Sequence, residues 1–198
     1  MTLTAEPIEQ REQQLNSLYR IGILATLGFV TMTFAALAVV FLIRSRVPLN
    51  WNHIILPPIL YIDTAILLAS SAVFELAHRR LKANRQTDFY RMTQIATGLG
   101  LLFLVGQVVA WLQILETGQL VRSNPHSSFF FIFSGMHGAH ILVGLAGMIA
   151  LLVRTREPAS GPKWQMNTRV LANSVSIFWH YLDFLWLVLF ALLLFVKR

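Results

Sequence analysis

Five long apolar runs dominate the sequence and leave few architectures open to it. Each run reaches the roughly 20 residues that a helix needs to cross the hydrocarbon core of a bilayer. They lie near residues 20–43, 55–77, 92–115, 128–153 and 171–196. The runs lack the period-two alternation of membrane barrel strands. The sequence therefore predicts an all-α integral membrane protein, in which one bundle of five transmembrane helices spans residues 20–198 and follows a polar tail over residues 1–19.

Composition and charge agree with this class. Charged residues make up 13% of the chain and hydrophobic residues 56%, whereas soluble domains carry about 25% charged residues. Most of the 16 Lys and Arg residues fall before the first run and in the connections that follow the second and fourth runs. The positive-inside rule then places the N-terminus in the cytoplasm and the C-terminus in the periplasm. The net charge of +7 is explained by topology, so we expect no nucleic-acid partner.

The first run is longer than the roughly 7–15 apolar residues of a signal-peptide core and has no clear small-residue cleavage motif, so we expect it to be retained. The chain contains no cysteine. Disulfides, thiolate metal sites and thiol nucleophiles are thereby excluded, and any haem or metal ligand would have to be His, Met or a carboxylate.

Several ionisable or polar residues interrupt the last three apolar runs. His137 and His140 are three residues apart, as are His180 and Asp183, and Gln107 lies in the third run. Residues with this spacing share a helix face. An ionisable group at membrane depth costs roughly 2.5–3.5 kcal/mol on insertion scales, so such groups normally have partners or a function.

Three interpretations of these residues are open. They could satisfy one another between helices, they could handle protons, or they could bind a metal or haem. Axial ligation of one iron by His137 and His140 is excluded because both lie on one helix face, although either could pair with His180. The first interpretation is the favoured one, and the spacing does not separate it from proton handling.

The second run adds two carboxylates and a basic end. Asp63 lies one to two turns inside the run, and Glu75 lies near its basic end. The Glu75 carboxylate is expected to be neutralised by a neighbouring Arg. The basic residues that follow are candidates for lipid head-group contacts, at about 1 kcal/mol each near an anionic surface, although a generic positive-inside loop is the favoured explanation. They are Arg79, Arg80, Lys82 and Arg85.

Read in order, four motifs resemble subunit III of the haem–copper respiratory oxidases, the cytochrome c and quinol oxidase family. The motifs are Trp51…Pro57-Pro58…Asp63-Thr64…Ser70-Ser71, Phe103…Gln107…Trp111, Ser134-Gly-Met-His137-Gly-Ala-His140 and Trp179-His180-Tyr-Leu-Asp183-Phe-Leu-Trp186. The last two are specific and the first two are supportive. Five helices rather than seven resemble the short bacterial form.

The resemblance implies a non-catalytic subunit of a proton-translocating terminal oxidase in a bacterial inner membrane. Such a subunit carries no cofactor, because haem and copper belong to its partners. The implied partners are subunit I by direct packing, subunit II, a small subunit IV and phospholipids. The implied role is to bind lipid and to support proton uptake and the stability of the complex.

The sequence departs from the family pattern at three positions. The carboxylate that relatives often carry in the first helix is absent from Gly28-Phe-Val-Thr-Met-Thr-Phe34, Asp63 replaces the usual Asn, and Ala110 stands where relatives often have an acid. We expect these differences to affect fine regulation rather than the overall role.

Three alternatives to an oxidase subunit follow from the same residues. They are a subunit-III-like component of a nitric oxide reductase, an autonomous membrane cytochrome b, and a solute transporter that uses Asp63 and Glu75. The internal repeats and broken helices that are common in transporters are not evident in the sequence.

Overall fold

The structure, a computed structural model, describes residues 8–47, 56–116, 125–156 and 161–195. Every element in these ranges is an α-helix. The helices are α1 (Ile8–Ser45), α2 (Ile59–Lys82), α3 (Gln86–Glu116), α4 (Pro125–Thr155) and α5 (Pro162–Phe195). All five are long and apolar enough to cross a membrane, which confirms the predicted fold class. A helix suits this environment because its backbone hydrogen bonds are satisfied within the segment.

Proline and one left-handed residue mark several helix ends. The α4 and α5 helices begin at Pro125 and Pro162, where the missing N–H is harmless because the first amides of a helix have no intrahelical partner. At the end of α2, Asn84 has a φ of 59°. The Arg85 N–H donates to the Arg80 carbonyl oxygen at 2.9 Å, and the Asn84 N–H donates to the Leu81 carbonyl oxygen at 3.0 Å. This pair of bonds is a Schellman turn, which reverses the chain tightly into α3.

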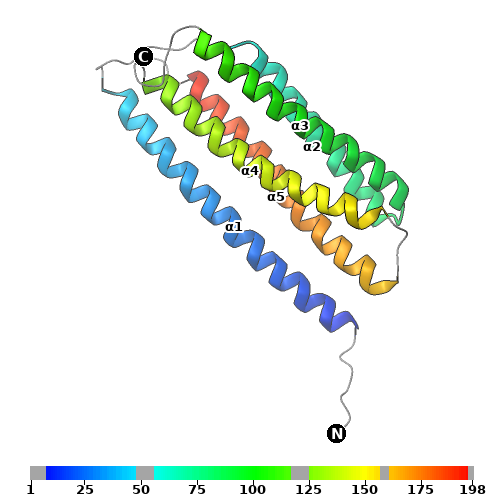
Figure 1. Cartoon of the computed structure of the whole chain (residues 1–198). Coiled ribbons are helices and arrows are strands. Elements are labelled where there is room, and N and C mark those ends of the chain that lie inside the picture. The colour runs from blue at the N-terminus through cyan, green and yellow to red at the C-terminus, as the bar shows by residue number, and fades with distance from the viewer. Residues whose placement is uncertain (1–7, 48–55, 117–124, 157–160, 196–198) are drawn as a thin grey trace.

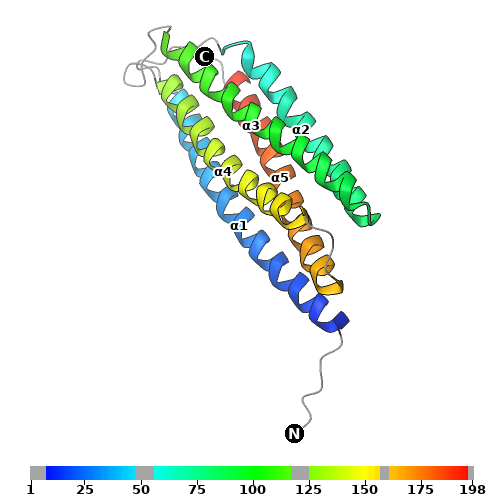
Figure 2. The ribbon, with the colours of Figure 1, turned by 45° about the vertical axis from the view of Figure 1, so that its right-hand side comes forward.

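Four of the helices form a closed ring, and α1 lies outside it. The ring is built from the contacts of α2 with α3, α3 with α4, α4 with α5 and α5 with α2. The first helix packs on α4 and α5 alone among the described elements, as Figures 1 and 2 show from two sides. Its buried apolar residues Val30, Phe34 and Phe41 all lie in its second half. The contacts of α1 are therefore concentrated toward its C-terminal end.

The centre of the ring is rich in aromatic side chains. Phe74, Phe103, Phe133, Trp179 and Trp186 are each at most 1% exposed. The Trp186 indole is edge-on to Phe103, with ring centroids 5.4 Å apart. Such edge-to-face pairs stabilise a core by about 0.5–1.5 kcal/mol beyond burial of their area.

The Trp179 indole is packed closely against two glycines on neighbouring helices. A Cβ atom at Gly100 or at Gly144 would lie 2.8 Å from the nearest indole carbon. Helix packing in membranes commonly uses small residues in this way, because they let large neighbours approach the backbone. The two glycines therefore shape the contact of α3 and α4 with α5.

The observed helices are longer than the predicted runs. The first helix begins at Ile8, so residues 8–19 of the polar segment are helical. The second helix continues through the basic residues as far as Lys82. Both extensions are polar helix formers, which the apolar pattern does not capture. The motif residue Trp51 lies outside the described residues.

Candidate functional site

The polar residues predicted from the sequence do not form a single network. They separate into three clusters between helices and one residue that is bound by its own helix. The rotation of each ring helix about its own axis decides which of its polar side chains enter a cluster.

The first cluster joins α2 to α3. The Gln107 Nε2 atom donates to Asp63 Oδ2 at 2.6 Å, and the two residues are 3% and 1% exposed. Gly106 makes room for this pair, since a Cβ atom at that position would overlap the Asp63 carboxylate. The other carboxylate oxygen and the Gln107 Oε1 atom are buried without a hydrogen-bond partner among the described residues.

The second cluster surrounds His137. The imidazole is fully buried and is stacked on the Trp186 ring at a centroid distance of 5.0 Å. Its edge contact with Phe103 has a centroid distance of 5.9 Å. Neither ring nitrogen has a hydrogen-bond partner among the described residues. The Trp186 Nε1 atom donates to Thr64 Oγ1 at 3.0 Å, which ties this aromatic stack to α2.

The third cluster is a polar ladder, defined by Arg79, Glu75, His180, Ser71 and Asp183, between α2 and α5. Arg79 Nε lies 2.8 Å from Glu75 Oε1, and His180 Nε2 lies 3.5 Å from Glu75 Oε2. The Ser71 hydroxyl lies 2.6 Å from His180 Nδ1. The Asp183 carboxylate is buried beside the same hydroxyl, but neither of its oxygens has a hydrogen bond of ordinary geometry among the described residues.

The ladder runs from the basic end of α2 toward the middle of the bundle. The predicted contact of Glu75 with a neighbouring Arg is confirmed. The side chains of Glu75 and His180 are each 39% exposed on the outer surface of the chain, whereas Ser71 and Asp183 are buried. The ladder thus joins a partly exposed, charged end to a buried carboxylate.

His140 stands apart from all three clusters. Its Nδ1 atom lies 2.7 Å from the carbonyl oxygen of Met136, one turn earlier in the same helix. Its ring contacts Phe34 of α1 at a centroid distance of 5.6 Å. His137 contacts Trp186 of α5 and His140 contacts Phe34 of α1, so the two histidines have different neighbours although they lie three residues apart. The three intramembrane histidines have different neighbours and do not converge.

Two polar contacts between helices were not predicted from the sequence. The Trp111 Nε1 atom donates to Ser134 Oγ at 2.8 Å between α3 and α4. The Thr31 and Tyr181 hydroxyls lie 2.6 Å apart between α1 and α5. Both pairs join residues whose helices had to be placed side by side before the contact could be recognised. Trp111 and Ser134 both belong to the sequence motifs, and this shared membership could have suggested that they form a pair.

Within the described ranges, no group of three or more His, Cys, Asp or Glu side chains is placed so that it could share a metal ion.

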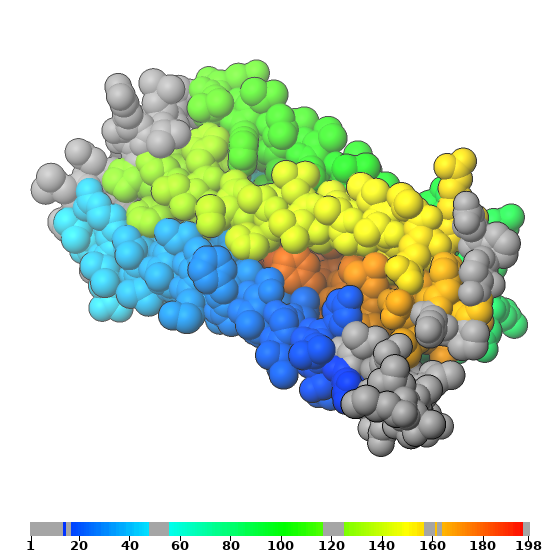
Figure 3. All heavy atoms as spheres, turned by 60° about the horizontal axis from the view of Figure 1, so that its bottom comes forward, coloured from blue at the N-terminus to red at the C-terminus, as the bar shows by residue number. Residues whose placement is uncertain are grey.

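An apolar groove separates the first half of α1 from the ring. Two adjoining hollows of about 260 and 310 Å³ share Ile23, Thr26 and Ser174, and the larger also contacts Tyr19. In the space-filling view, α5 is visible between α1 and α4 along this groove (Figure 3). The lining of both hollows is mostly apolar.

Comparisons with known proteins identify the family. The family model described as cytochrome c oxidase subunit III matches residues 23–197. A protein named "Probable cytochrome c oxidase subunit 3" from Nocardia farcinica is 29% identical over 96% of this chain and 95% of its own length. A "Cytochrome c oxidase subunit 3" from Corynebacterium diphtheriae is 30% identical over 74% of this chain and 69% of its own length.

A third relative, from Thermostichus vulcanus and also named "Cytochrome c oxidase subunit 3", is 28% identical over 69% of this chain and 65% of its own length. The family match begins within α1 and covers α2 to α5 completely, including the segments that carry the four motifs. The chain is a multi-pass membrane protein, and it belongs to the cytochrome c oxidase subunit III family.

Proposed function

We propose that this chain is the non-catalytic subunit III of a proton-translocating haem–copper terminal oxidase. It would be inserted in a bacterial inner membrane with its N-terminus in the cytoplasm and its C-terminus in the periplasm. The observation that carries the proposal is the family match across residues 23–197. Subunit III of an oxidase works in a complex, so we propose direct packing on subunit I, with subunit II and a small subunit IV in the same assembly.

The surroundings of the histidines support a role without a redox centre in this chain. The His137 ring is enclosed by two aromatic rings, and His140 is bound to its own helix backbone. His180 contacts Ser71 and Glu75 on α2. These arrangements are typical of polar groups that set the packing of membrane helices. Haem and copper would accordingly reside in subunits I and II.

Lipid binding forms part of the same proposal. Acyl chains fit the apolar groove between α1 and the ring. The basic residues at the end of α2 would attract anionic head groups. Lipid held in this groove would fill the gap beside α1 and so help to stabilise the complex.

A role in proton handling is favoured by one observation, the polar ladder. It places two proton-binding groups, Glu75 and His180, 3.5 Å apart at the partly exposed surface and leads to the buried Asp183. Chains of His and carboxylate groups of this kind serve proton transfer in membrane proteins. We propose that the ladder supports proton uptake by the complex, while the Asp63–Gln107 pair acts in packing.

The proposal is tested by purifying the chain from native membranes through an affinity tag and identifying what accompanies it. A many-helix haem–copper subunit and an oxidase subunit II are expected. Recovery with nitric oxide reductase subunits would contradict the oxidase assignment. Recovery of the chain alone, with its own haem spectrum, would identify a membrane cytochrome b instead.

A further inference from the structure

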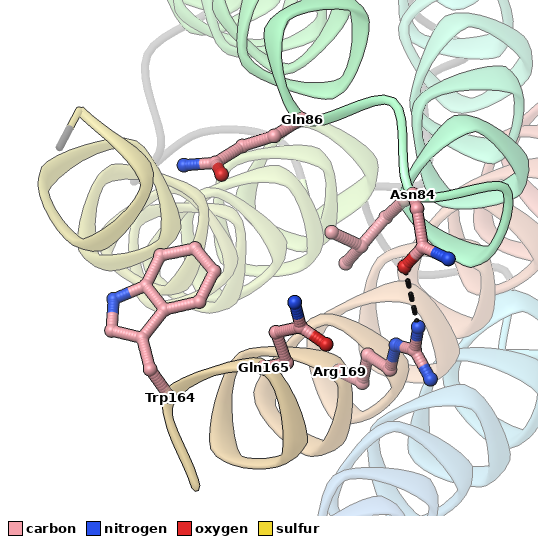
Figure 4. A pocket seen from close by; sticks show the side chains of 6 residues that line it. Asn84, Gln86, Trp164, Gln165 and Arg169 are labelled. Carbon is pink, nitrogen blue, oxygen red and sulfur yellow. Dashed lines mark hydrogen bonds between the residues drawn. The ribbon is translucent and has the colours of Figure 1, made fainter. Parts of the chain in front are cut away.

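A cavity with a mixed polar and apolar lining opens at the end of the bundle where α2 turns into α3 and α5 begins (Figure 4). Its volume is about 90 Å³, several times the ~10–15 Å³ that one water molecule requires by this measure. Six residues from three helices and the turn line it, namely Leu81, Asn84, Gln86, Trp164, Gln165 and Arg169. The cavity lies close to the basic residues of α2 but does not include them among its lining residues.

The exposed Arg169 guanidinium group lies at one side of the cavity. Arg169 Nη2 donates to Asn84 Oδ1 at 2.8 Å, and Figure 4 shows this bond. The left-handed backbone of Asn84 belongs to the Schellman turn between α2 and α3. A guanidinium has five N–H donors, and the bond to Asn84 uses one of them. The others suit an anion rich in oxygen, since Arg recognises phosphate groups well.

The remaining walls divide into neutral donors and an apolar surface. The Gln86 amide is anchored through its Nε2 atom to the Thr155 carbonyl oxygen at 3.1 Å, and the Gln165 amide lies between Gln86 and Arg169 (Figure 4). Trp164 and Leu81 supply apolar surface. A Trp beside polar groups is typical of the membrane–water interface.

The charge around the cavity favours an anion. The segment from Arg79 to Arg85 contains four basic residues, and Asp88 in the first turn of α3 is the nearest acid in sequence. Basic residues at a bilayer surface attract anionic head groups. A lining with both donors and apolar surface matches the polar and apolar parts of a phospholipid.

We infer that this cavity binds the phosphate group of an anionic phospholipid, with Arg169 as the charged ligand and Gln165 as a second donor. Trp164 and Leu81 would contact the glycerol and the first acyl carbons. The inference rests on the lipid-binding part of the proposed function and gives it a site, separate from the apolar groove beside α1.

The test uses the purified complex that contains the full chain, exchanged into micelles with equal amounts of phosphatidylglycerol and phosphatidylcholine. Native mass spectrometry then measures each bound lipid. Arg169→Gln is expected to lower phosphatidylglycerol affinity about tenfold, the loss expected for a charge-assisted hydrogen bond. Gln165→Glu should produce a similar loss by repulsion, and because Gln165 is exposed this variant should fold normally.

The matched control is Arg85→Gln, which removes one exposed charge from the same end of the bundle without altering the cavity lining. It should reduce phosphatidylglycerol binding much less than Arg169→Gln. Equal losses in these two variants would overturn the site, as would equal retention of the two lipids by the unaltered chain.

A separate arm adds inorganic phosphate to the lipid-depleted complex. Failure of phosphate to bind at millimolar concentration is expected, whereas Arg169-dependent binding of free phosphate that prevents added phosphatidylglycerol from binding would overturn the headgroup assignment. The subunit composition of each sample reports on the proposed function independently. If oxidase subunits are missing, the oxidase proposal is contradicted. The lipid titration of the chain itself still tests whether the cavity binds phosphatidylglycerol.

Discussion

Gln107 on α3 donates a 2.6 Å hydrogen bond to the carboxylate of Asp63 on α2, and both side chains are buried. The contact requires Gly106, because a larger residue there would overlap the carboxylate. One buried donor therefore fixes how α2 and α3 are aligned along their length.

Gln107→Leu should lower the free energy of unfolding by about 1–3 kcal/mol, because it leaves the Asp63 carboxylate buried without its donor. Unfolding of the chain in detergent micelles, followed by helical circular dichroism, measures the change. The double variant Asp63→Leu with Gln107→Leu should recover much of the loss, since it removes both polar partners. Additive losses in the double variant would show that the two residues do not act as a pair.

Gly144→Ala should destabilise the bundle by about 1–3 kcal/mol, the usual effect of overpacking a well-packed core. The added methyl group would lie 2.8 Å from the Trp179 ring. Gly98→Ala is the matched control, because no atom lies within 4 Å of a Cβ built there. It should be neutral or slightly stabilising through helix propensity. Equal thermal midpoints for both variants would contradict the packing of Trp179 described above.

His137→Phe should preserve both stability and oxygen-reduction rate, because the imidazole makes ring contacts with Phe103 and Trp186 and no hydrogen bond to the described residues. His137→Ala should instead lower the free energy of unfolding by at least ~2 kcal/mol through the cavity that it leaves. Comparison of turnover in membranes with the two variants checks this. Loss of turnover in a stable His137→Phe complex would indicate that the imidazole has a chemical role.

Asp183→Ala should affect the stability of the chain and its association with the complex differently. The buried Asp183 oxygens make no well-formed hydrogen bond among the described residues, so replacing the carboxylate should leave the isolated chain equally or more stable. We expect weaker association with the catalytic subunit, without loss of haem, in co-purification experiments. His140→Ala serves as the comparison, because His140 contacts Met136 of its own helix and Phe34 of α1 and takes no part in the ladder. A smaller effect is expected from it, and the reverse order would count against a special role for the ladder.

The fold could be predicted from the apolar pattern, but the helix ends could not. The runs identified all five helices because a bilayer crossing demands about 20 apolar residues. The pattern stops where the bilayer ends, whereas α1 continues to Ile8 and α2 to Lys82 through polar helix formers. Hydrophobicity therefore locates the spans and gives little information about helical segments that project beyond them.

The candidate site could be predicted as a set of residues but not as a set of pairs. A three-residue step leaves two side chains about 60° apart around a helix, so His137 and His140 contact different helices. The Ser71–His180 and Asp63–Gln107 contacts depend on which helices are neighbours and how each is rotated. That information comes from the packing of Trp179 and the aromatic core, which the local sequence pattern does not contain.

We propose that this chain supports an oxidase without carrying a redox centre. This proposal is tested most directly by removing the chain from the purified complex and recording the reduced-minus-oxidised spectrum and the metal content of both fractions. We predict that all haem and copper stay with the remaining subunits, that the initial rate of oxygen reduction is largely kept, and that activity then declines faster during turnover. Haem or copper that leaves with this chain would contradict the claim.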